Sequence, residues 1–133
     1  MKYKLIEHPA DIKIKVWGQT LKELFRNAAL GMTKILKEKV PGGKATRRQI
    51  KVEASDQSLL LADFLSQLNT LASIHREVYP KIEFKELTRT KLWAYAFGVT
   101  VDRFDEEIKA VTYHELKVEK KGGKWQAVIL FDI

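Results

Sequence analysis

Apolar and polar residues alternate along residues 12–17, which read IKIKVW. Ile12, Ile14 and Val16 therefore fall on one face of the segment, and two lysines and a tryptophan fall on the other. A period of two is that of a β-strand, whose successive side chains point to opposite sides. The pattern predicts a half-buried strand that ends at Gly18.

Two segments have the three- and four-residue spacing of apolar positions that is typical of a helix packed on a core. The first is TLKELFRNAALGMTKILK, where Thr20 and Glu23 form a capping box at the start and the following VPGGK ends the helix. The second follows Asp56, a suitable cap, and its apolar positions are Leu60, Leu61, Phe64, Leu65, Leu68, Leu71 and Ala72.

The remaining patterns predict strands. QIKVEA lies between the two helices, and KIEFKEL, KLWAYAFGVTV, AVTYHELKVE and WQAVILFDI follow after Val78, with KKGGK as a hairpin turn between the last two. These elements favour an α+β fold. We expect a two-layer sandwich, in which a mainly antiparallel sheet is covered on one face by two helices. At 133 residues, the chain is expected to form a single domain, residues 1–133.

The composition excludes several classes of protein. No apolar run approaches the roughly 18 residues of a membrane span, and the N-terminal MKYKLIEH lacks the apolar stretch of a secretory signal. We therefore expect a cytoplasmic protein with no membrane contact. The chain has no cysteine, which leaves oxygen ligands and the three histidines, His8, His75 and His114, for any metal.

The formal net charge of +7 favours a polyanionic partner such as RNA. An RNA-binding module would use exposed Trp17, Trp93 or Tyr95 for stacking on bases. A lysine-rich surface that only keeps the protein soluble is the alternative.

The sequence does not predict an enzyme. Both GGK stretches, Gly42–Lys44 and Gly122–Lys124, lack the spacing of a phosphate-binding loop, and the serines beside the second helix have no nucleophile elbow around them. No nucleophile with a matching base is evident.

Two acids stand at the ends of predicted strands. Asp11 begins the first long strand, Asp132 is the next-to-last residue, and the carboxylate of the chain follows at Ile133. If the two aspartates lay about 5 Å apart, they would repel by roughly 3 kcal/mol at an effective dielectric constant near 20. A divalent cation such as Ca²⁺, Mg²⁺ or Mn²⁺ would relieve that repulsion, because hard cations take carboxylate ligands. The spacing alone leaves open that they are two unrelated surface acids.

Two histidines are further candidates. His8 precedes Pro9, which favours an extended approach to Asp11, and it could contact a partner, support a metal ligand or be an ordinary histidine at a strand end. His114 lies within a predicted strand, where a packed, hydrogen-bonded side chain is the alternative to a functional role.

Three segments, EHPADIKIKVWGQTLKELFRNAALGM, IKVEASDQSLLLADFL and IKAVTYHELKVEKKGGKWQAVILFDI, resemble the archease family from end to end. The resemblance implies a non-catalytic partner of the GTP-dependent RNA ligase that seals tRNA exons, where it would promote guanylylation and repeated turnover of the ligase. It implies a metal near Asp11, Asp132 and the carboxylate of Ile133. His8, Lys109 and His114 become candidates for the contact with the ligase or for support of the metal site.

The family resemblance leaves other functions open. A chaperone-like role towards an RNA methyltransferase and a basic RNA-binding module are the alternatives. The chain departs from the family pattern at three places. The family usually has threonine where this chain has Pro9, an Asn-Glu pair where it has SQLN with Gln67, and glutamate where it has Val99. These departures affect the metal shell and the ligase interface that the family pattern implies, and a divergent member with another client is a further alternative.

Overall fold

A computed structural model describes residues 2–7 and 11–133 of the chain. Within these residues, seven strands and two helices follow one another in the order β1 (Tyr3–Glu7), β2 (Asp11–Gly18), α1 (Leu21–Leu36), β3 (Thr46–Glu53), α2 (Gln57–His75), β4 (Glu77–Leu87), β5 (Lys91–Thr100), β6 (Ala110–Lys121) and β7 (Lys124–Asp132). Within the described ranges, neither helix combines the length and the apolar character needed to cross a bilayer.

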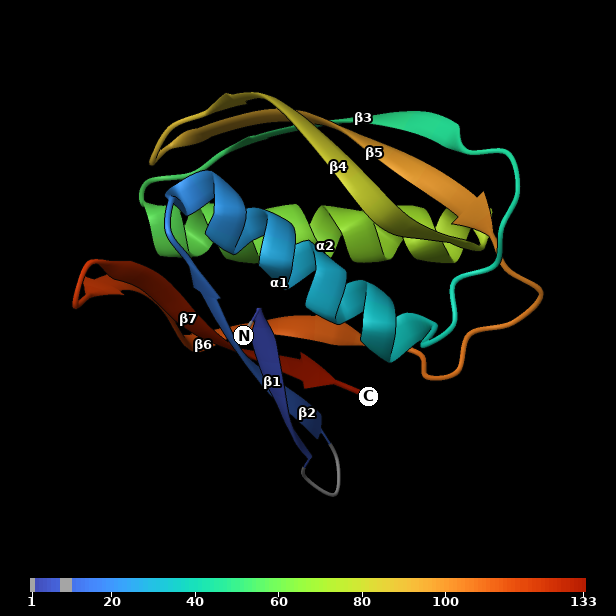
Figure 1. Ribbon diagram of the computed structural model, residues 1–133, viewed down its shortest axis with the longest axis horizontal. Helices are drawn as coiled ribbons and strands as arrows, with labels where there is room; N and C mark the ends of the chain where they lie inside the picture. Colours follow the sequence, from blue (N-terminus) through green and yellow to red (C-terminus); the bar gives the residue numbers. More distant parts are fainter. Residues whose placement is uncertain (1, 8–10) are drawn as a thin grey trace.

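The strands form two antiparallel sheets. The first sheet has the order β1-β2-β7-β6, and the second has the order β3-β5-β4. The two helices lie between the sheets (Figure 1): α1 contacts β2 and β4, and α2 contacts β6 on one side and the three strands of the second sheet on the other. The predicted α+β sandwich is confirmed.

The layers are arranged differently from the prediction, which had one sheet and one helical layer. The reason lies in α2, whose buried side chains are Leu60, Leu61, Ala62, Phe64, Leu65, Leu68 and Ala72. A helix that is apolar on more than one side must be covered on more than one side. Phe64 shows the result, because its ring packs between Phe25 of α1 at 5.9 Å and Phe84 of β4 at 5.8 Å between centroids.

The predicted ends of several elements are confirmed. The hydroxyl of Thr20 accepts a hydrogen bond from the backbone N–H of Glu23 at 3.1 Å, and the carboxylate of Asp56 accepts one from the N–H of Leu59 at 2.9 Å. Both are N-caps, which satisfy donors that the first helical turn leaves unpaired. The KKGGK turn joins β6 to β7 and contains two glycines with positive φ, of 56° and 78°, which suits a tight hairpin.

A buried ion pair fixes the start of β4 to β3. Glu77 is only 3% exposed, and its carboxylate accepts hydrogen bonds from Arg48 Nε at 3.0 Å, from Arg48 Nη2 at 2.8 Å and from the hydroxyl of Tyr79 at 3.1 Å. These contacts, with Arg48 first, hold the pKa of Glu77 below its ordinary value. Burial raises the pKa of the Tyr79 hydroxyl. Gly98 of β5 lies directly against this cluster.

Candidate functional site

Asp11 and Asp132 face each other at one end of the two central strands of the first sheet, β2 and β7; we call this end of the sheet the acidic edge. β2 begins at Asp11, β7 ends at Asp132, and the antiparallel register makes the two residues direct partners. Directly opposed antiparallel residues have Cβ atoms about 4.5–5.5 Å apart on the same face. Their neighbours Ile12 and Phe131 are buried on the helix side, so the two carboxylates lie on the outer side. The structure thus brings together the two acids that the sequence analysis selected.

One oxygen of Asp11 is unsatisfied. Asp11 Oδ1 is buried, and it has no hydrogen-bond partner among the described residues. A buried polar atom without a partner is costly, so such atoms are usually bonded to protein, water or an ion. The donor set at this position, two carboxylates with the end of the chain beside them, consists of oxygen and fits a hard divalent cation.

The end of the chain and Lys109 lie beside Asp132. The backbone N–H of Lys109 donates to the carbonyl of Asp132 at 2.7 Å, and Ala110 is the register partner of Asp132 on β6. The Lys109 side chain is exposed. Ile133 is partly buried and packs against the core, which holds the chain end close to this edge. Asp11, Asp132 and Ala110 therefore form one row across three strands.

His114 lies on the same side of the sheet as Asp11. The pairing of β6 with β7 is irregular between Thr112 and Lys117, and Glu115 adopts a positive φ of 65°. This bulge breaks the alternation that the sequence pattern suggested, so His114 is 85% exposed, not packed in the core. Nε2 of His114 lies 3.6 Å from a carboxylate oxygen of Glu115.

A shallow hollow of about 290 Å³ lies between Asp11 and His114, and it is lined by Asp11, Lys13, His114, Glu115, Val128 and Leu130. Lys13 and Glu115 are not among the site residues predicted from the sequence. The alternation around Lys13 placed it on the outer face of a strand, but nothing in the sequence indicated that a bulge in β6 would place Glu115 beside the same hollow.

The described residues contain no cluster of three or more histidine, aspartate or glutamate side chains that could hold a metal. His8 and Pro9 lie outside the described residues.

The other two departures from the family pattern, Gln67 and Val99, contact or belong to the second sheet. The side-chain amide of Gln67 on α2 donates to the carbonyl of Lys51 on β3 at 3.2 Å, and Val99 is buried on β5. Neither belongs to the edge formed by Asp11 and Asp132.

Comparisons of sequence give consistent matches. The model of the archease protein family (MTH1598/TM1083) matches residues 3–133. A protein archease of Methanosarcina mazei is 37% identical over 142 residues, which covers 99% of this chain and 96% of the relative. A protein archease of Pyrococcus abyssi is 36% identical over 135 residues, with 96% and 95% covered.

Two solved structures have the same fold. The solution structure of protein 1598 of Methanobacterium thermoautotrophicum superposes with a TM-score of 0.74 at 26% identity, and covers 98% of each chain. An archease of Thermotoga maritima, described as a possible chaperone, superposes with a TM-score of 0.70 at 21% identity, covering 98% of this chain and 96% of its own. At that identity the second likeness concerns the fold alone.

Proposed function

Because this chain belongs to the archease family, we propose that it is a non-catalytic activator of the GTP-dependent RNA ligase that joins tRNA exons. The observation that supports a specific working surface is the opposition of Asp11 and Asp132 at one edge of the first sheet, with a buried Asp11 oxygen that lacks a partner. In this proposal the activator promotes guanylylation of the ligase and its repeated turnover.

The acidic edge would hold a divalent cation through the carboxylates of Asp11 and Asp132, with the carboxylate of Ile133 as a third oxygen donor. A bound cation would relieve their mutual repulsion and offer an open coordination position to an oxygen donor of the partner. Lys109 adds a fixed cationic residue beside Asp132, because its backbone is hydrogen-bonded there. His114 adds an exposed imidazole at the adjoining hollow.

The activator would act by binding. A partner's conformational equilibrium shifts only by as much as the bound protein prefers one state over the others. The edge formed by Asp11 and Asp132 would therefore have to fit best the conformation of the ligase that accepts GTP. The proposal assigns no covalent step to any residue of this chain.

The test is a count of ligation turnovers. The ligase is incubated with GTP, Mn²⁺ and excess split tRNA, with and without a substoichiometric amount of this protein. We expect many turnovers per ligase only in its presence, and we expect Asp11→Asn and Asp132→Asn to lose the stimulation. Asp102→Asn is the matched control, because its side chain is an exposed acid, 82% accessible, on the loop after β5.

Two results would contradict the proposal at different levels. Full stimulation by both Asp11→Asn and Asp132→Asn would remove the acidic edge from the mechanism. No stimulation by the wild-type protein, with a ligase from the same source, would remove the activator role. Suppressed aggregation of an RNA methyltransferase in that second case would favour the chaperone-like alternative.

A further inference from the structure

The outer side of the second sheet carries a row of aromatic rings. Along β5, Leu92, Ala94 and Ala96 point towards the helices and are buried. The residues that alternate with them, Trp93, Tyr95 and Phe97, therefore point away from the helices. The rings of Trp93 and Tyr95 meet edge to face at 6.2 Å between centroids, and Trp93 is 36% exposed. Within the described chain, no other helix or strand covers this side of the sheet.

Each ring has a cation beside it from a neighbouring strand. Arg47 lies 4.4 Å from the centroid of the Tyr95 ring, Lys51 lies 5.2 Å from Trp93, and Lys81 lies 4.9 Å from Phe97. Arg47 and Lys51 come from β3, and Lys81 comes from β4, so the cations flank the aromatic row on both sides. We call this set of residues the aromatic-basic face: Arg47, Lys51, Lys81, Trp93, Tyr95 and Phe97.

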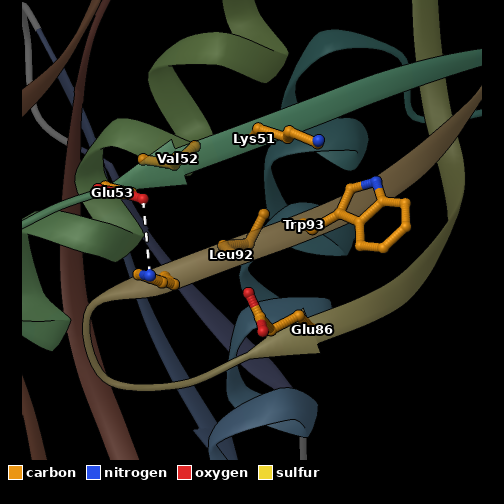
Figure 2. A pocket seen from close by; sticks show the side chains of 7 residues that line it. Lys51, Val52, Glu53, Glu86, Leu92 and Trp93 are labelled. Atoms are coloured by element: carbon orange, nitrogen blue, oxygen red, sulfur yellow. Dashed lines mark ion pairs between the residues drawn. The ribbon is translucent and has the colours of Figure 1, made fainter.

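The acids near this face are mostly paired with other cations. Glu83 pairs with Lys85, and Glu53 pairs with Lys91 at 3.9 Å. Glu86 on β4 and Lys51 on β3 are the register partners of Trp93, and they lie on opposite sides of β5 (Figure 2). None of the three cations beside the rings forms an ion pair within residues 2–7 and 11–133. Glu83 is the register partner of Tyr95, and Lys85, helped by the nearby Lys81 and Arg47, holds the pKa of Glu83 below its ordinary value. The face still carries more cations than acids beside its aromatic rings.

We propose that the aromatic-basic face binds single-stranded RNA. Same-side residues on a strand are spaced about 7 Å apart, so the three rings form a continuous platform on which successive unpaired bases can stack. Arg47, Lys51 and Lys81 pair with the phosphates that border the stacked bases. Cation–π contacts at exposed sites are weak, so long side chains can leave the rings when a phosphate is available. Duplex RNA is excluded from this mode because its bases are already stacked on one another.

The charge distribution favours RNA over a protein partner. A protein surface matched to this face would need acids opposite each of the three cations, whereas RNA supplies a phosphate at every nucleotide. The formal net charge of +7 adds a long-range attraction for the same polyanion. The face lies on the second sheet, across the helical layer from Asp11 and Asp132, so it does not depend on the proposed activator function.

Binding is measured by fluorescence anisotropy of a labelled oligouridylate, which has no stable secondary structure, and of a duplex RNA of equal length. We expect saturable, salt-sensitive binding of the oligouridylate and weaker binding of the duplex. Trp93→Ala should weaken the oligouridylate complex about tenfold or more, because one stacking platform is lost, and Trp93→Phe should retain most of the affinity. Lys51→Gln should reduce the slope of log affinity against log salt by about 0.7.

Trp17→Ala is the matched control. Trp17 also has a lysine beside its ring, with Lys15 Nζ at 5.4 Å from the centroid, but it lies on the outer side of the first sheet. Its substitution should leave RNA affinity unchanged. Equal losses for Trp17→Ala and Trp93→Ala in well-folded variants would overturn the proposal, as would equal affinity for duplex and oligouridylate. Absent RNA binding, with a protein partner that loses affinity for Trp93→Ala, would overturn it in favour of a protein-binding face.

Discussion

Gly98→Ala should destabilise the protein by crowding a buried carboxylate. A Cβ atom added at Gly98 would lie 2.7 Å from Cδ of Glu77 and 2.8 Å from Cε1 of Tyr79, and it would lie closer still to Glu77 Oε1. Ordinary contact begins at 3.4 Å, so the carboxyl carbon must move by about 0.7 Å. The backbone at Gly98 itself does not need glycine, because its φ is not in the left-handed region.

The magnitude follows from what that movement disturbs. Glu77 Oε1 accepts hydrogen bonds from Arg48 at 3.0 Å and from Tyr79 at 3.1 Å, and a displacement of this size takes at least one of them out of hydrogen-bonding range. Overpacking a core costs about 1–3 kcal/mol, and a lost hydrogen bond to a buried charged group adds about 1.5 kcal/mol. We expect the free energy of unfolding to fall by about 2.5–4.5 kcal/mol.

Urea unfolding at neutral pH, followed by far-ultraviolet circular dichroism, measures this loss. For an m-value of about 2 kcal/mol/M, the midpoint should fall by about 1–2 M. Gly42→Ala is the control, because a Cβ at Gly42 would meet nothing within 4 Å. That variant should match the wild type or be slightly more stable, because alanine restricts the unfolded chain. Equal midpoints for Gly98→Ala and Gly42→Ala would refute the reasoning.

Three further predictions concern stability and metal binding. Since the pKa of Glu77 is lowered in the folded state, stability should be lost as pH falls below the ordinary value of 4.5, and acid unfolding of Glu77→Gln should show a shallower pH dependence in that range. Phe64→Ala should cost about 3–5 kcal/mol in the same urea assay, whereas Leu59→Ala, at an exposed position, should cost under about 1 kcal/mol; similar losses would contradict the packing described for α2. Saturating Ca²⁺, at about 100 times its Kd, should stabilise the wild type by about 2.7 kcal/mol, roughly 10 °C in melting temperature, and a chelator should reverse the shift. Asp11→Asn and Asp132→Asn should lose this shift, and an undiminished shift in both would show that the cation binds elsewhere.

The sequence by itself determined the features that depend on neighbours within a few residues. The alternation around Ile14 defines β2, the side chains of Thr20 and Asp56 cap the two helices, and the paired glycines at Gly122 and Gly123 form the last hairpin. Each involves contacts within about four residues, where chain connectivity already limits the choices. The motifs at the two ends of the chain also identified the family, which the comparisons confirm.

Only the tertiary structure decided which distant segments meet. The pairing of β2 with β7 placed Asp11 against Asp132, and the bulge in β6 turned His114 to the surface. The aromatic rings of β5 were visible in the sequence, but the cations beside them come from β3 and β4. Strand partners and their register depend on how the buried faces of all elements fit together, and a local pattern of apolar and polar residues marks which face is buried without specifying what covers it.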